Sequence, residues 1–265
     1  MSVNSSPPGS LIHQVEDEIG PISVHQNQNL LYLSFGNKTE QSCLTIDQPH
    51  RLEHAYTQAM MLSLLMKQDM RSVLILGLGG GSLVRALRHF RQKLKIDAIE
   101  YRQAVIDVAR QYFALPEDHA LNIICDDAGH YIKATAQRYD LIFTDLYLPE
   151  GMDQLQLSQQ YLEHCKAHLM DDGLVIVNFW SHDFKQTLQR QQALEQVFGK
   201  QVLNTQVPGG NTITFAFNDA IPRLNKKDFT AAAQKLGQQL EIPLQNLARG
   251  FWQMNAAALQ MSRYP

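Results

Sequence analysis

The sequence predicts an α/β fold: a mostly parallel, seven-stranded, Rossmann-like sheet, closed by an antiparallel hairpin and preceded by a small antiparallel β unit. Three observations predict it. Residues 73–85 have the pattern of a buried strand, a glycine-rich turn and a helix. Four successive strand-like segments end in glycine or an acidic residue and alternate with helical patterns. The last two strand-like segments are joined by Pro-Gly-Gly-Asn at residues 208–211, which is typical of a hairpin.

The composition of the chain excludes several classes of protein. Of its 265 residues, 45% are hydrophobic and 18% are charged, as in a globular protein with a large core. The formal net charge of −3 gives no general attraction for nucleic acid, so we predict no nucleic-acid partner. No apolar segment approaches the roughly 18 residues that cross a membrane. Three scattered cysteines and an N-terminus without a signal-peptide pattern predict a cytoplasmic protein.

The chain divides into four predicted parts. Residues 1–10 are expected to form a disordered tail, and residues 11–48 a small N-terminal β unit. Residues 49–221 form the predicted nucleotide-binding domain. Residues 222–265 have a helical pattern and are expected to form an extension that packs back on the domain or contributes to a dimer contact.

A long helical pattern over residues 51–68 precedes the glycine-rich segment, and its apolar face predicts packing against the sheet. Tyr56 and Gln58 in this helix are predicted to reach the ligand cleft, with an ordinary core position as the alternative for Tyr56. His50 and His54 are four residues apart, but no acidic partner stands at metal-binding spacing. We therefore predict no metal site.

The glycine-rich segment is the predicted centre of the site. Residues 73–76 are apolar and form the strand, Gly77, Gly79 and Gly81 lie in the turn, and Ser82 is placed to cap the next helix. Backbone amides at such a helix N-terminus can approach a polar ligand closely. Four glycines within five residues predict that a ligand lies against this backbone.

The helix after the glycine turn carries Arg85, Arg88 and Arg91, whose spacing of three places them along one side. Two interpretations are open. The arginines could bind an acidic partner, or they could form a solvated face. The negative net charge of the chain favours the solvated face.

Polar residues mark the ends of the following strands. Glu100 ends the second strand, where a carboxylate can accept hydrogen bonds from ribose hydroxyls. Asp127, with Ala128 beside it, follows the third strand and can accept from an adenine amino group. Asp145 ends the fourth strand, and Asn178 stands near the end of the fifth. Since the carboxyl ends of parallel strands meet at one edge of a sheet, these residues predict a ligand site there.

The glycine spacing separates two kinds of nucleotide. A dinucleotide fingerprint, G-x-G-x-x-G, usually has Gly or Ala at the last position, where this chain has Ser82. Gly77, Gly79 and Gly81 instead give G-x-G-x-G, which resembles the loop of class I S-adenosylmethionine-dependent methyltransferase folds. We therefore predict an adenosyl nucleotide of the S-adenosylmethionine type as the co-substrate.

The chain as a whole resembles the spermidine synthases, the polyamine aminopropyltransferases, over roughly residues 20–220. ILGLGGGSLVR is similar to the glycine-rich loop of that family, and DLYLPEG to its D-S-S-D-P-x-G-P loop. The resemblance implies that Glu100 binds ribose, that Asp127 and Ala128 hold adenine, and that Asp145 accepts the proton of an attacking amine. The predicted acceptor-binding residues are Tyr56, Gln58, Tyr147 and Asn178.

Three positions depart from the pattern of that family. Leu148 stands where the loop has its second aspartate, Gly80 where the glycine turn has an aspartate, and Val207 where a tyrosine lines the amine site. A diamine carries two positive charges and needs carboxylates at both ends. We therefore expect a small-molecule, amine-type acceptor other than putrescine, with Glu150 and Asp153 as the acids that could substitute for the missing one.

The predicted function is that of a spermidine synthase-like transferase, in which Asp145 deprotonates an amine that attacks the aminopropyl carbon of decarboxylated S-adenosylmethionine. Two alternatives stay open: methyl transfer from S-adenosylmethionine to an unknown small molecule, and a non-catalytic nucleotide-binding protein. A homodimer is also expected.

Overall fold

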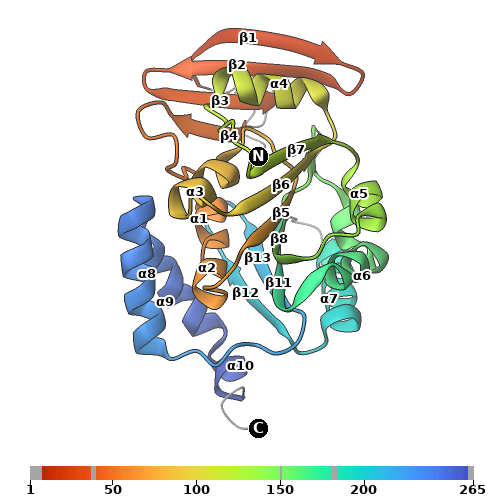
Figure 1. The fold of residues 1–265 in the computed structure, drawn as a ribbon, viewed down its shortest axis with the longest axis vertical. Coiled ribbons are helices and arrows are strands. Elements are labelled where there is room, and N and C mark those ends of the chain that lie inside the picture. Colours follow the sequence, from red (N-terminus) through yellow and green to blue (C-terminus); the bar gives the residue numbers. More distant parts are fainter. Residues whose placement is uncertain (1–7, 37–39, 150, 181–183, 262–265) are drawn as a thin grey trace.

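The computed structural model describes residues 8–36, 40–149, 151–180 and 184–261 (Figure 1). A four-stranded antiparallel sheet lies at one end of the molecule, and a seven-stranded sheet with helices on both faces forms the rest. This architecture confirms the predicted α/β fold with a small N-terminal antiparallel unit.

The N-terminal sheet pairs its strands in chain order, each antiparallel to the next. Its strands are β1 (Ser10–Asp17), β2 (Gly20–Asn27), β3 (Leu30–Phe35) and β4 (Glu40–Thr45). One face of the sheet is apolar and packs against α4 (Gln103–Tyr112). Residues 1–7, most of the predicted tail, lie outside the described residues, and residue 10 already belongs to β1.

The central sheet has the strand order β12-β13-β11-β8-β5-β6-β7, in which β13 alone runs antiparallel to its neighbours. Its strands are β5 (Ser72–Leu76), β6 (Lys95–Glu100), β7 (Leu121–Cys125), β8 (Tyr139–Thr144), β11 (Leu169–Trp180), β12 (Val202–Gln206) and β13 (Asn211–Phe217). The predicted hairpin therefore closes the sheet as β12 and β13. Because β5 and β8 are buried on both faces, they consist of almost continuous apolar residues.

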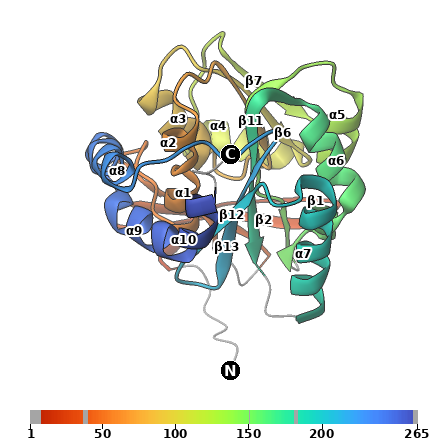
Figure 2. The same ribbon diagram turned by 90° about the horizontal axis from the view of Figure 1, so that it is seen from below.

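Two layers of helices cover the central sheet (Figures 1 and 2). One face carries α1 (Ala55–Met60), α2 (Ser63–Met66), α3 (Ser82–Phe90), α8 (Lys226–Leu240) and α9 (Leu244–Met254). The other face carries α5 (Ala128–Ala134), α6 (Gln159–Ala167) and α7 (Phe184–Phe198). The chain continues as α10 (Ala256–Met261). Within the described residues, no helix is long and apolar enough to span a membrane.

The single long helix predicted over residues 51–68 is wrong. Residues 51–53 are not helical, and the helical part is divided into α1 and α2. The hydroxyl of Thr57 donates to the carbonyl of His54 at 2.8 Å, where α1 begins, and the Ser63 hydroxyl donates to the carbonyl of Met60 at 2.7 Å at the break. Because residues 59–66 are all buried, tertiary packing outweighs helical propensity in determining the path of their backbone.

Both interpretations of the arginine row on α3 are also wrong, because the three side chains bind carbonyls of the chain itself. Arg85 is buried and donates to the carbonyls of Pro49, Gly80 and Phe113. Arg88 pairs with Asp118 and also binds the carbonyls of Gln92 and Leu94. Arg91 binds the carbonyls of Gln68 and Met70. The row therefore fixes loops around α3.

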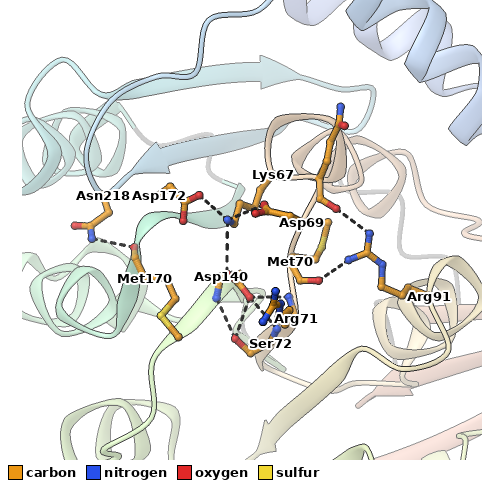
Figure 3. Close-up of polar contacts among 11 residues, drawn as sticks. Lys67, Asp69, Met70, Arg71, Ser72, Arg91, Asp140, Met170, Asp172 and Asn218 are labelled. Atoms are coloured by element: carbon orange, nitrogen blue, oxygen red, sulfur yellow. Dashed lines mark hydrogen bonds and ion pairs between the residues drawn. The ribbon is translucent and has the colours of Figure 1, made fainter.

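A lysine-centred cluster lies at the amino end of the central strands (Figure 3). The Lys67 ammonium is 2.6 Å from Asp172, 2.8 Å from Asp69 and 3.8 Å from Asp140. Asp140 also accepts hydrogen bonds from the backbone amides of Arg71 and Ser72. The cluster connects the end of α2 to β11 and to the starts of β5 and β8. It lies at the amino edge of the sheet, whereas the predicted site residues follow the carboxyl ends of the strands.

Candidate active site

The candidate site lies along the carboxyl ends of β5, β6 and β8. Strand pairing places Leu76 beside Ile99 and Thr144, so the residues that follow these strands share one edge. A cavity of about 250 Å³ opens there. The predicted residues that line this first cavity are Tyr56, Gly77, Gly79, Glu100, Asp127, Ala128, Asp145 and Tyr147. The structure thus brings together residues from separate segments of the chain.

Gly77 is required by the chain itself. Its φ of 95° is left-handed, and a Cβ at this position would lie 2.3 Å from the carbonyl oxygen of Asp145. The amide of Gly77 donates to the carbonyl of Ile99 at 2.9 Å, and the amide of Asp145 donates to Leu76 at the same distance. A side chain at position 77 would push β5 and β8 apart where the cavity begins.

Gly77 and Gly79 line the first cavity, whereas Gly80 and the predicted cofactor-binding residue Gly81 do not. The amide of Gly80 donates to the Ser42 hydroxyl at 2.9 Å, and a Cβ at position 80 would lie 2.9 Å from the Ser42 Cβ. The N-terminal sheet therefore occupies the space that an aspartate at position 80 would need. Gly81, rather than the predicted Ser82, is the N-cap of α3, in the left-handed conformation that glycine favours.

Glu100 holds the glycine turn in place. One carboxylate oxygen accepts the amides of Leu78 and Gly79 at 3.2 and 3.3 Å, and the other accepts the amide of Arg102 at 3.1 Å. Burial raises the pKa of Glu100, and these backbone donors act against the rise. Glu100 thus fixes the position of the loop as well as lining the cavity.

Asp127 lies at the end of β7 and caps α5. Its carboxylate accepts the amide of His130 at 2.7 Å through one oxygen, which leaves the second oxygen free of that bond. The neighbouring Asp126 binds the His130 ring at 2.9 Å. Asp127 therefore both caps α5 and lines the first cavity.

Asp145 is the carboxylate at the centre of the site. The side-chain amide of Asn178 donates to it at 2.8 Å, and the Tyr56 hydroxyl forms a second hydrogen bond. Burial raises the pKa of Asp145 to about 6, against the lowering effect of the Asn178 and Tyr56 hydrogen bonds. Such a carboxylate can hold a proton and release it near neutral pH.

A polar relay supports Asp145 from β11 and β13. The side-chain amide of Asn211 donates to the side-chain oxygen (Oδ1) of Asn178 at 2.9 Å, which orients the Asn178 amide nitrogen towards Asp145. The buried Gln156 accepts from the Thr144 hydroxyl at 2.6 Å and donates to the carbonyl of Leu146 at 3.3 Å. These contacts fix the segment that carries Asp145.

The loop after β8 folds over the site. It contains a short hairpin of β9 (Tyr147–Leu148) and β10 (Gly151–Met152), followed by a 3₁₀ helix, η1 (Gln154–Leu157). Asp153 caps this helix by accepting the amide of Leu155 at 2.8 Å. Asp153 lines the first cavity, whereas Glu150, the other predicted substitute acid, lies outside the described residues.

A second cavity of about 370 Å³ adjoins the first. The two cavities share a wall that contains Tyr56, Tyr147 and Leu148. The lining of the second cavity further includes Glu40, His54, Asn178, Trp180 and Asn211. Burial raises the pKa of Tyr147, and its hydroxyl has no partner at hydrogen-bonding geometry among the described residues.

Two residues from the sequence prediction lie elsewhere. Gln58 lines neither cavity, because its amide donates to the carbonyl of Leu52 at 2.7 Å and so braces the turn into α1. Val207 is buried in the core and also lines neither cavity. Tyr56, by contrast, occupies the cavity wall and is not merely a core aromatic.

The two histidines do not share a helix face, because both precede α1. His50 stacks on His89 with ring centroids 3.7 Å apart, and His54 lies beside Glu40. In the described part of the chain, no group of three or more His, Cys, Asp or Glu residues is placed to hold a metal ion.

Several site residues were not predicted from the sequence. Glu40, His54, Trp180 and Asn211 line the second cavity, and Gln156 supports the loop. The Pro-Gly-Gly-Asn turn was a signal for Asn211, since it places that residue at the start of a strand, where it pairs with Trp180 and reaches the Asn178 side chain. Glu40 gave no such signal, because its approach to the site depends on how the N-terminal sheet docks.

Comparison with known proteins gives a consistent result. The spermine/spermidine synthase domain family matches residues 53–218. A polyamine aminopropyltransferase from Chromobacterium violaceum is 29% identical over 226 residues, which cover 83% of each chain. One from Neisseria meningitidis serogroup A is 27% identical, over 86% of this chain and 88% of its own.

Solved structures have the same fold. A spermidine synthase in complex with the transition-state analogue AdoDATO matches with a TM-score of 0.72 and 19% identity, over 95% of this chain and 89% of its own. Human methyltransferase-like protein 13 in complex with SAH matches with a TM-score of 0.58 and 24% identity, over 71% of this chain and 90% of its own.

The fold and these relatives define a class of protein, the transferases built on a class I methyltransferase-like α/β sheet. Within that class, the chain belongs to the spermine/spermidine synthase domain family. The family membership confirms the resemblance found in the sequence, and it does not favour a methyltransferase or a non-catalytic binding protein.

Proposed function

We propose that this protein transfers an aminopropyl group from decarboxylated S-adenosylmethionine to an amine acceptor. The observation that carries the proposal is Asp145, a partly buried carboxylate that lines the first cavity and whose pKa is raised to about 6. The names of the relatives, polyamine aminopropyltransferases, support the same reaction.

In this reaction the nitrogen of the acceptor attacks the aminopropyl carbon next to the sulfonium. A carbon–nitrogen bond forms while the carbon–sulfur bond breaks, and the electron pair of the broken bond neutralises the sulfur, giving methylthioadenosine. Asp145 takes the proton that the amine loses. Tyr56 and Asn178 keep the carboxylate in place, so the reacting groups are held in line and positioning supplies much of the acceleration.

The first cavity is the proposed nucleotide site. Glu100 lies where it can bind the ribose hydroxyls, and Asp127 with Ala128 lies where adenine is expected. Gly77 and Gly79 line this cavity where the methionine-derived part of the nucleotide is expected. The SAH and AdoDATO complexes of the two structural neighbours support an adenosyl nucleotide in this place.

We further propose an acceptor other than putrescine. Leu148 lines both cavities at the position where the family pattern has an acid, so an ammonium beside it would lose water without gaining a carboxylate. We expect wild-type efficiency on putrescine below about 10⁴ M⁻¹s⁻¹.

Product analysis tests the proposed reaction. The protein is incubated with an amine mixture and either decarboxylated S-adenosylmethionine or S-adenosylmethionine, and the nucleoside product is identified by chromatography. Methylthioadenosine from the decarboxylated donor supports aminopropyl transfer. S-adenosylhomocysteine from the other donor would instead show methyl transfer. Calorimetry with both donors, and with NAD as a control, measures binding independently of turnover.

A further inference from the structure

The second cavity is suited to a cation. Aromatic rings of Tyr56, Tyr147 and Trp180 line it together with the amides of Asn178 and Asn211. Aromatic faces and amide oxygens both attract an ammonium group. No lysine or arginine among the described residues lines this cavity, so its lining contains no fixed positive charge.

Among the residues that the structure describes, Glu40 is the carboxylate that lines this cavity. The Glu40 side chain is 30% exposed, and its carboxylate lies 3.3 Å from Nε2 of the His54 ring, which also lines the cavity. Burial raises the pKa of Glu40 and lowers the pKa of His54, so the histidine is neutral at pH 7 and gives no countercharge. A partly desolvated carboxylate without a cation is costly unless a ligand supplies one.

Carboxylates line both cavities: among the described residues these are Glu100, Asp126, Asp127, Asp145 and Asp153 in the first and Glu40 in the second. Asp145 lines only the first cavity and Glu40 lines only the second. Leu148 lies on the wall that they share, together with Pro149, and the described residues of this wall carry no charge. A ligand that spans both cavities therefore meets acid, then an apolar stretch, then acid.

We propose that Glu40 binds a second ammonium group of the acceptor, far from the amine that reacts at Asp145. This inference rests on the aminopropyl transfer proposed above. It names the acceptor class as a diamine or polyamine whose hydrocarbon spacer runs along Leu148.

A matched pair of acceptors tests the proposal by kinetics. Cadaverine and pentylamine have the same five-carbon chain, and only cadaverine carries the second ammonium. The wild type should prefer cadaverine in kcat/KM by about 10- to 100-fold, the value of a charge-assisted hydrogen bond. Glu40→Gln should remove most of this preference by raising KM for cadaverine, with little change for pentylamine. Glu53→Gln is the control, because Glu53 lines neither cavity.

Calorimetry separates this inference from the proposed reaction. Cadaverine is titrated into the wild type and each variant in the presence of methylthioadenosine, with melting temperatures as the check on folding. Binding that is weakened at least 10-fold only in Glu40→Gln supports the inference even if no transfer is detected. Transfer with an unchanged cadaverine preference in Glu40→Gln overturns the inference and leaves the reaction standing. A wild type that does not bind cadaverine also overturns it.

Discussion

Asp145 is subject to two opposing effects, burial and hydrogen bonding. Burial favours the neutral acid, while the donors Tyr56 and Asn178 favour the carboxylate. Burial is the larger effect, so the pKa settles near 6 and the carboxylate is the main form at pH 7. Asp145 is therefore ionised in the resting site, yet it binds a proton more readily than an exposed aspartate does.

Replacing this carboxylate tests its role as the base. Asp145→Asn keeps the shape of the side chain and removes the proton acceptor, so turnover should fall by roughly 10²–10⁴. Affinity for methylthioadenosine, measured by calorimetry, should stay close to that of the wild type. Unchanged turnover in the variant would remove Asp145 from the mechanism.

The raised pKa also predicts a pH dependence of the rate. The base must be deprotonated, so activity is present above the pKa and should fall about tenfold per unit as the pH decreases below about 6. The measurement is kcat at saturating acceptor from pH 5 to 8. The residual activity of Asp145→Asn serves as the control, because it should lack this acidic limb.

Leu148 allows the complementary experiment of restoring an acid. Leu148 is 37% exposed, so an aspartate fits there without burying an unpaired charge. Leu148→Asp should raise kcat/KM for putrescine by about tenfold, since it offers a carboxylate to a short diamine. Leu148→Asn, which has a similar shape without the charge, is the control. Equal putrescine efficiency in both variants would contradict the electrostatic explanation.

At the scale of single residues, the sequence predicted the strand-end positions well and the second cavity poorly. Asp145 and Asn178 come directly from strands whose register fixes them, so strand pattern alone brings them to one edge. Glu40 and His54 belong to segments around the docked N-terminal sheet. No periodicity in the chain encodes that docking.

At the scale of elements, the glycines correctly predicted the strand–turn–helix of β5 and α3. The structure, however, requires these glycines for a different physical reason. The sequence suggested that the glycines allow a ligand to lie against this backbone. In the structure, the neighbouring backbone requires Gly77 and the N-terminal sheet fills the space at Gly80. Periodicity could not predict that the helical segment after Pro49 is divided into α1 and α2, since both helices keep an apolar face. The burial of the whole segment determines where it bends.

Two Gly→Ala substitutions separate the free-energy cost of backbone strain from the cost of a steric clash. Gly199 has a φ of 58° with no other atoms within 4 Å of its Cβ position, so Gly199→Ala should cost only the strain, about 1–2 kcal/mol. Gly77→Ala adds a clash with the Asp145 carbonyl and should cost a further ~1–3 kcal/mol. Urea unfolding measures both free energies.

Nucleotide binding provides the second measurement for the same pair. Gly77→Ala should also weaken methylthioadenosine binding, because it displaces the loop at the cavity, whereas Gly199→Ala should not. Equal losses of stability in the two variants would show that the turn relaxes around the new methyl group.

At the scale of the whole molecule, the two edges of the central sheet have different tasks. The carboxyl edge holds polar groups around open cavities, and the amino edge holds the Lys67 cluster, whose charges are paired with one another (Figure 3). Burial lowers the pKa of Lys67, but the hydrogen bonds to Asp172 and Asp69 outweigh this effect and the pKa is raised. The contribution of the lysine to this stabilisation is therefore present at neutral pH and is lost as the pH rises through its raised pKa.

Removing the lysine should lower stability without affecting the site. Lys67→Met leaves the buried Asp140 without its cation, but Asp140 keeps its hydrogen bonds from Arg71 and Ser72, so we expect a loss of about 1–3 kcal/mol and not the larger loss of an orphaned ion. Asp172→Asn, on the exposed side of the cluster, should lower the urea midpoint less than Lys67→Met. Affinity for methylthioadenosine should be the same in both variants and the wild type, because the cluster lies across the sheet from the cavities. A weaker nucleotide affinity in Lys67→Met at a temperature where it is folded would show that strain passes along β5 or β8 from one edge to the other.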